Sequence, residues 1–192
     1  MNIENIPQAL RQYPQWVLWR EEQRTDKHGK PVLDKHGKTK MTKVPYTVQG
    51  AKASSTNNND WATFEAVKQA YENESGGFDG IGFVFSENDP FTGIDIDDCF
   101  SILTGFTELA DSIIKQLNSY TEFSHSGEGI HIIVEATLPR GSRKDSKKGL
   151  EMYDKKRFFA LTGKLVSDTK PTVEKRQQEV NELYQEHFHK DK

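Results

Sequence analysis

The amino-acid sequence predicts an α+β fold, built from short strands and helices that do not alternate regularly. Compact apolar runs at residues 16–19 and 81–85 are typical of buried strands. Residues 107–117 carry Leu109, Ile113, Ile114 and Leu117 at helical spacing, which predicts a helix. The length of 192 residues is sufficient for one domain of moderate size with a short appendage.

The N-terminal third is expected to place a short helix at residues 3–11 before the strand at 16–19. Two copies of Asp-Lys-His-Gly-Lys, at 26–30 and 34–38, predict a pair of glycine turns in a basic, exposed hairpin. Asp60 is expected to cap a helix at 61–73, which Gly76 and Gly77 end.

The rest of the chain is interpreted as paired strands and two further helices. The expected order is a hairpin of 81–85 with 93–97, the helix 107–117, paired strands at 120–126 and 129–136, a basic loop at 140–148, a hairpin of 150–153 with 157–162, and a charged helix at 171–188.

Composition excludes several classes of protein. A formal net charge of −3 is atypical of a broadly basic DNA coat, so contact with nucleic acid is expected to be local. The single cysteine, Cys99, excludes an intramolecular disulfide framework and favours a reducing compartment. No apolar run reaches the length of a membrane span, and no segment resembles the phosphate-binding loop of an ATPase motor. The protein is expected to be cytoplasmic, without a membrane partner.

Asp95 and Asp97 are the first candidates for chemistry, in the segment Gly-Ile-Asp-Ile-Asp. Because side chains alternate along a strand, both carboxylates are expected on one face. Paired carboxylates repel each other unless a cation lies between them, and their oxygens suit Mg²⁺ or Mn²⁺. Taken alone, the pair is more typical of a solvent-facing strand with two acids and a turn that begins at Asp98.

Ser126, Gly127, Gly129 and His131 form a second candidate element. The two glycines permit a tight turn whose backbone amides can approach an anion, and His131 can donate a hydrogen bond to a phosphate oxygen. An ordinary hairpin turn with a half-buried histidine is the alternative.

Glu151 can complete a site of three carboxylates, because alternation places it on one face with Tyr153. Arg157, at the start of the next strand, can neutralise charge on a phosphate, with a salt bridge to Asp154 as the alternative. Lys43 is a weaker candidate for a nucleotide or template contact.

In this order and spacing, these elements resemble the archaeo-eukaryotic primase superfamily, particularly the bifunctional primase-polymerase domains of phages, plasmids and mobile elements. The resemblance extends over residues 10–165 and includes Trp-Val-Leu-Trp at 16–19, Lys-Val-Pro-Tyr at 43–46 and Arg-Phe-Phe-Ala-Leu-Thr-Gly at 157–163. It implies an RRM-like antiparallel catalytic sheet with flanking helices and a smaller N-terminal α/β lobe. The third acid is Glu where many relatives have Asp, and the cysteine cluster of many primases is absent.

The resemblance also implies an activity, template-directed synthesis of DNA or primers from nucleoside triphosphates during replication. Asp95, Asp97 and Glu151 would bind Mg²⁺ or Mn²⁺, whereas Ser126, His131 and Arg157 would contact the nucleotide, beside Gly127, Gly129 and Lys43. The catalytic domain is expected to span residues 1–168, with a charged helix or linker at 169–192. This tail would link the domain to a replicative helicase, serve as a docking helix or cap the C-terminus.

Single-stranded DNA or a primer-template is the expected second substrate. The basic stretches at 20–43 and 140–148 are its predicted contacts, the second through Arg140, Arg143, Lys144, Lys147 and Lys148. Two other classes of function fit the same residues, a metal-dependent nuclease and a non-catalytic replication-initiation or single-strand-binding module.

Overall fold

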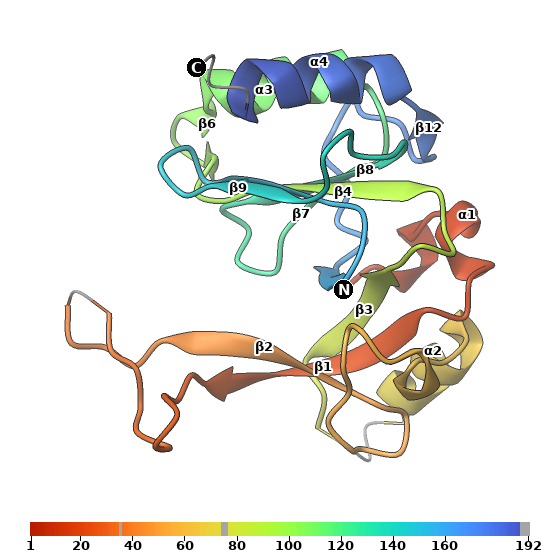
Figure 1. The fold of residues 1–192 in the computed structure, drawn as a ribbon, viewed down its shortest axis with the longest axis vertical. Helices are drawn as coiled ribbons and strands as arrows, with labels where there is room; N and C mark the ends of the chain where they lie inside the picture. The colour runs from red at the N-terminus through yellow and green to blue at the C-terminus, as the bar shows by residue number, and fades with distance from the viewer. Residues whose placement is uncertain (35, 74–76, 189–192) are drawn as a thin grey trace.

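The computed structural model describes residues 1–34, 36–73 and 77–188, in which two sheets lie one above the other (Figure 1). The four-stranded sheet has the order β11-β3-β1-β2, and its neighbours pair antiparallel. Its strands are β1 (Trp16–Gln23), β2 (Met41–Tyr46), β3 (Gly80–Phe85) and β11 (Arg157–Leu161). Helix α2 (Phe64–Glu72) packs beside this sheet, where Phe64 and Val67 are buried in a core shared with β1 and β3.

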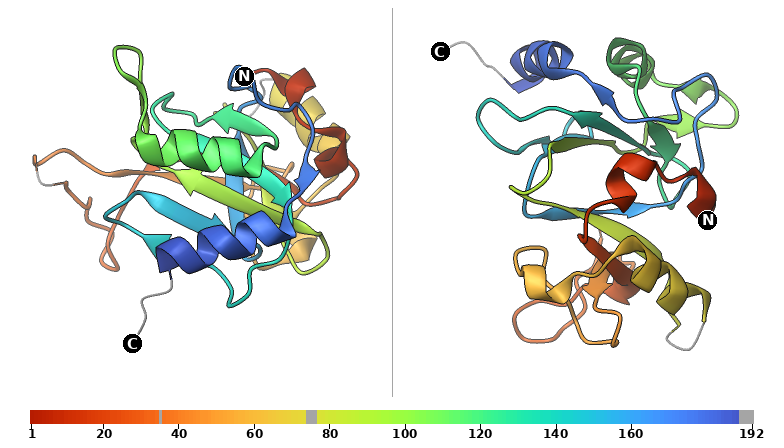
Figure 2. Two further views of the ribbon diagram at one scale, coloured as in Figure 1. Left: turned by 90° about the horizontal axis from the view of Figure 1, so that it is seen from above. Right: turned by 90° about the vertical axis from the view of Figure 1, so that its right-hand side faces the viewer.

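The six-stranded sheet has the order β12-β8-β4-β10-β9, with β7 paired to β8. Its strands are β4 (Phe91–Ile96), β7 (Thr121–Phe123), β8 (Ile130–Glu135), β9 (Arg143–Asp145), β10 (Leu150–Tyr153) and β12 (Glu174–Lys175). Helices α3 (Glu108–Leu117) and α4 (Gln177–Phe188) cover one face, as Figure 2 shows from two sides. The remaining elements are η1 (Ile3–Asn5), α1 (Gln8–Arg11), η2 (Asn58–Asp60), β5 (Phe100–Ser101) and β6 (Gly105–Phe106).

Strand alternation divides the six-stranded sheet into an apolar face and a chemically rich face. Ile94 and Ile96 of β4, with the corresponding residues of β8 and β10, pack under α3 and α4. Helix α4 contributes Val180 and Leu183 to this core. Asp95, which lies between Ile94 and Ile96 on β4, therefore faces the four-stranded sheet.

Gly93 allows the two sheets to approach closely at β4. A Cβ atom placed on Gly93 would lie 2.4 Å from Cε2 of Phe159 and 2.6 Å from Cζ of Phe85. Those two rings belong to the four-stranded sheet and pack edge to face, with centroids 4.9 Å apart. The absence of a side chain at Gly93 therefore makes room for the aromatic contact that joins the sheets.

Both hairpins predicted from sequence for the strand pairs 81–85 with 93–97 and 150–153 with 157–162 are wrong. Each pair is split between the sheets, since β3 and β11 pair with each other whereas β4 pairs with β10. At the first crossing, Asp89 accepts hydrogen bonds from the backbone of Ser86 and Phe91 and from the Gln15 amide, which fixes a turn that leaves the four-stranded sheet. The second crossing passes through Lys156, whose φ is +59°.

Other boundaries also differ from the sequence-based expectation. The first predicted helix is divided into η1 and α1 by Pro7, which lacks a backbone donor. Thr63, rather than Asp60, caps α2 by accepting a hydrogen bond from the Ala66 amide, and the helix ends at Glu72. Gly76, predicted to help end it, lies outside the described residues.

The predicted basic loop at 140–148 contains strand β9, and the predicted helix at 171–188 contains β12 before α4 begins at Gln177. The helix at 107–117, with Thr107 as its cap, and the pairing of β7 with β8 confirm the expectation. The mixed α+β class is also confirmed.

The basic hairpin between β1 and β2 extends away from both sheets as a long arm (Figure 1). Each of its two turns is closed by an aspartate: Asp26 accepts from the amides of His28 and Lys30, and Asp34 accepts from those of His36 and Lys38. Lys35, part of the second predicted turn, lies outside the described residues. In the part of the chain that the structure describes, no helix has the length and apolarity needed to cross a membrane.

Candidate active site

Asp95 lies at the centre of three neighbouring strands. It is directly opposite Glu151 on β10 and directly opposite His131 on β8. Side chains of residues paired in this way project from the same face of a sheet. The backbone register therefore brings together the three residues that the sequence marked as separate candidates.

Asp97 lies one residue beyond the end of β4, not within the strand as predicted, and is exposed. Its amide donates to the Gly149 carbonyl at 2.9 Å, which holds it beside the start of β10. A Cβ on Gly129 would lie 2.8 Å from the Ile96 carbonyl, and one on Gly149 3.0 Å from the Asp97 carbonyl. Glycines on both neighbouring segments thus let the backbone close tightly around Asp97.

The aspartates are held at an electrostatic cost. Burial raises the pKa of Asp95, and the nearby charges of Asp97 and Glu151 add to this effect, against the lowering effect of His131. Asp97 is exposed at its surface but partly desolvated by its neighbours; this desolvation, then the charges of Glu151 and Asp98, raise its pKa. A cation between such carboxylates would remove the repulsion.

Glu151 is buried and already has partners. Lys144 donates to its Oε1, the Tyr153 hydroxyl donates to Oε2 at 2.5 Å, and Nη2 of Arg157 lies 3.7 Å from Oε2. Burial would raise the pKa of Glu151, but the hydrogen bonds from Lys144 and Tyr153 hold it below its ordinary value. Arg157 is thus paired with Glu151 rather than with Asp154.

His131 is buried between two carboxylates. Its Nδ1 lies 3.0 Å from Oε1 of Glu122, and its Nε2 lies 3.9 Å from Oδ1 of Asp95. Burial alone would lower the pKa of His131, but the hydrogen bond to Glu122 and the charge of Asp95 raise it. The ring is therefore prepared to donate from Nε2 when an anion approaches.

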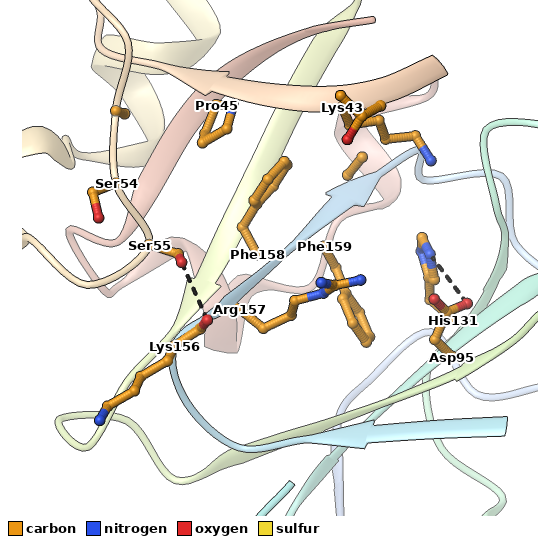
Figure 3. A pocket seen from close by; sticks show the side chains of 13 residues that line it. Lys43, Pro45, Ser54, Ser55, Asp95, His131, Lys156, Arg157, Phe158 and Phe159 are labelled. Atoms are coloured by element: carbon orange, nitrogen blue, oxygen red, sulfur yellow. Dashed lines mark hydrogen bonds and ion pairs between the residues drawn. The ribbon is translucent and has the colours of Figure 1, made fainter. Parts of the chain in front are cut away.

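A cavity of about 530 Å³ opens between the sheets above Asp95 and His131 (Figure 3). Lys43 from β2, His131 from β8 and Arg157 from β11 line it, so three of the predicted nucleotide contacts face the same space as Asp95. In Figure 3 the Arg157 guanidinium extends toward the side of the cavity that holds His131 and Asp95. The cavity thus combines cationic side chains with Asp95, whereas Asp97 and Glu151 are not among its lining residues.

The other predicted contacts lie outside this cavity. Ser126 is exposed in the turn before β8, where its hydroxyl is 3.1 Å from that of Ser124, and Gly127 has a φ of +80°. Gly129 packs against the backbone at Asp97, so the turn adjoins the carboxylate site without lining the cavity. The basic residues cluster on and around the edge strand β9, the positions being Arg140, Arg143, Lys144, Lys147 and Lys148.

Several residues of the site were missed by the sequence analysis. Ser54, Ser55 and Lys156 line the cavity, and the Ser55 hydroxyl donates to the Lys156 carbonyl at 3.1 Å. Glu122 lies in no recognisable sequence motif, and only its position opposite His131 shows that it belongs to the site. Tyr153 could have been found, because alternation already placed it on the same face as Glu151.

The donor set suits a divalent ion in its chemistry. Carboxylate oxygens on one face are the ligands that Mg²⁺ and Mn²⁺ favour, and Asp95 and Asp97 repel each other as they stand. Among the described residues, no three Asp, Glu, His or Cys side chains already form a metal-binding group. The Glu151 carboxylate is instead engaged by Lys144 and Tyr153.

The raised pKa of Asp95 leads to a prediction for stability. A carboxyl with a higher pKa in the folded than in the unfolded chain destabilises the fold at neutral pH, and the penalty disappears as the pH falls through the folded-state pKa. Asp95→Asn should therefore raise the melting temperature at about pH 8, and it should raise the melting temperature less at about pH 5. Thermal unfolding in chelator-containing buffer measures this, and a gain independent of pH would contradict it.

Paired carboxylates beside a cavity with cationic side chains are typical of enzymes that transfer phosphoryl or nucleotidyl groups. No family model matches the chain. A DNA primase-polymerase of the Nitratiruptor phage NrS-1 is 32% identical over 171 residues, which cover 85% of this chain and 21% of that protein. This similarity supports assignment of the chain to the primase-polymerase family, and the chain spans about a fifth of the length of this relative.

Proposed function

We propose that this chain is the nucleotidyl-transfer domain of a template-directed DNA primase-polymerase that uses Mg²⁺ or Mn²⁺. The main support for this proposal is that Glu151, Asp95 and His131 lie opposite one another in register on three neighbouring strands, with Glu151 and His131 on either side of Asp95. A cavity lined by Lys43 and Arg157 opens above Asp95 and His131. The name of the phage relative supports the activity. An RRM-like catalytic sheet and a role in replicating a phage, plasmid or mobile element belong to the same proposal.

Each residue has a defined task in the proposed reaction. Asp95 and Asp97 would hold the divalent ions, which on binding would activate the attacking 3′-hydroxyl and stabilise the leaving pyrophosphate. His131, as an imidazolium whose Nδ1 donates to Glu122, would donate from Nε2 to a phosphate oxygen of the incoming nucleotide. Lys43 and Arg157 would neutralise the outer phosphates of that nucleotide. Ser126, Gly127 and Gly129 would shape the neighbouring turn.

Glu151 would join the metal ligands by exchanging Lys144 for the ion. Lys144 lies on the edge strand β9, and 53% of its side chain is exposed, so it can withdraw into solvent. In the absence of a metal ion its ammonium group supplies the positive charge that a buried carboxylate needs. The same lysine would then be available to a DNA phosphate.

Incubation with labelled primer-template, deoxynucleotides and Mg²⁺ or Mn²⁺ tests the proposal. Primer extension supports it, whereas shortening of the primer would indicate a nuclease. Single-strand binding without either reaction, unchanged in Asp95→Ala and Asp97→Ala, would indicate a non-catalytic module. An unprimed template with ribo- or deoxynucleotides then separates priming from extension.

Template binding is proposed along β9 and the following turn, and it gives a prediction. Replacing Arg143, Lys147 and Lys148 with alanine should weaken binding of single-stranded DNA and reduce the slope of log affinity against log salt by about 2, as expected for up to three lost phosphate contacts. Titration by fluorescence anisotropy at several salt concentrations measures both. The control removes Lys115 and Lys175, which are exposed at positions away from β9; equal effects in the two variants would contradict the assignment.

A further inference from the structure

Glu122 is a fully buried carboxylate with an unusual number of donors around it. On β7, its side chain is 0% exposed. Oε2 accepts from the Tyr120 hydroxyl at 2.6 Å and from the Gly163 amide at 2.8 Å, and both oxygens lie 3.1 Å from the Thr162 amide. Such a carboxylate is fixed in place, because moving it would leave several buried donors unpaired.

The fixed carboxylate in turn holds the His131 ring. Oε1 of Glu122 lies 3.0 Å from Nδ1, and the ring stacks on Phe159 with centroids 4.8 Å apart and planes 25° apart. A carboxylate only accepts, so the contact requires a proton on Nδ1. The hydrogen bond and the stacked ring together leave Nε2 facing the cavity and Asp95.

The anchors of Glu122 connect the two sides of the cavity. Thr162 and Gly163 directly follow β11, the strand that carries Arg157 and Phe159. Glu122 and His131 face each other across β7 and β8 of the other sheet. One carboxylate therefore sets the position of His131 relative to the strand that supplies Arg157.

We propose that Glu122 is a positioning residue for nucleotidyl transfer, which acts by holding the His131 ring with Nδ1 protonated and Nε2 directed at the nucleotide phosphates. This rests on the proposed function, through the phosphate contact of His131. A carboxylate behind a functional histidine fixes both the orientation and the tautomer of the ring, and losing such a partner typically costs about 10- to 100-fold in function.

The first test observes the ring without requiring catalysis. Long-range ¹H–¹⁵N NMR spectra of the protein without nucleotide should show His131 with a proton on Nδ1, assigned by comparison with His131→Ala. An unprotonated Nδ1 with the proton only on Nε2 would overturn the proposal. This measurement uses the wild-type chain, so it decides even if Glu122 variants do not fold.

The second test is a double-mutant cycle on primer extension. Glu122→Gln should lower kcat/KM for the nucleotide by about 10- to 100-fold in the wild-type background. In the His131→Ala background the same change should cost less than about twofold, because a positioning residue has nothing left to position. Equal losses in both backgrounds would show a purely structural role and overturn the proposal.

Glu135→Gln is the matched control, since Glu135 lies on the same strand as His131 but at its exposed end, 3.7 Å from Lys175. It should leave kcat/KM unchanged. Failure of the wild-type chain to extend any primer would overturn the proposed function alone, because the NMR result on the Glu122–His131 contact does not depend on polymerisation. The two conclusions can therefore fail separately.

Discussion

Primer extension by Asp95→Asn and by Asp97→Asn is expected to fall by about a thousandfold or more, while both variants remain folded. Asparagine keeps the size of the side chain but removes the charge and one of the oxygens that would bind a divalent ion. Asp95 lies between Glu151 and His131, and Asp97 is held next to it by Gly149.

Asp98→Asn is the matched control for both variants. Asp98 is exposed and adopts a left-handed conformation, with φ of +49°, that asparagine tolerates well. Extension should stay close to the wild-type rate in this variant. Substantial activity in Asp95→Asn or Asp97→Asn at saturating Mg²⁺ or Mn²⁺, with circular dichroism confirming the fold, would contradict the assigned carboxylates.

A second large effect is expected at Gly93. Gly93→Val should destabilise the protein by about 1 to 3 kcal/mol or more, because its side chain would overlap the Phe85 and Phe159 rings that join the sheets. Thermal denaturation should show a fall in melting temperature of several degrees. Since Phe159 also stacks on His131, extension should decline as well.

A compensating variant distinguishes this cause from a general effect on β4. Phe159→Leu removes the ring edge that the valine would meet, so the double variant should lose less stability than the sum of the two single variants. Strict additivity would show that Gly93 does not set the distance between the sheets. An unchanged melting temperature in Gly93→Val would contradict the packing argument itself.

Sequence patterns predicted where most strands lie, but not reliably which strands pair: β7 with β8 was predicted correctly, whereas two hairpins were not. Residues 81–85 and 93–97 both read as strands and are close in sequence, so a hairpin was expected. Periodicity along a strand does not specify its neighbour, and the turn closed by Asp89 sends the chain to the other sheet. Lys156 turns the chain with a positive φ, without the glycine that normally signals such a conformation.

The candidate site was predictable where local alternation was enough. Asp95, Glu151 and His131 each stood out from their own segments, and the structure places Glu151 and His131 opposite Asp95 on its two neighbouring strands. The pairing of Glu151 with Lys144 was not predictable, because Lys144 belonged to a segment interpreted as a loop. Glu122 was missed because a buried glutamate gains its meaning only from residues far away in the sequence, such as Thr162.

The divided arrangement of the cavity has a mechanical consequence. Asp95, which would anchor one end of a triphosphate through a metal ion, belongs to the six-stranded sheet. Lys43 and Arg157 belong to the four-stranded sheet. A nucleotide that contacts both groups of residues would bridge the two sheets. Its affinity would therefore depend on the distance between the sheets as well as on each individual contact. Substitutions at Gly93 or Phe85, where the sheets pack together, would therefore weaken nucleotide binding without changing a residue that contacts the nucleotide.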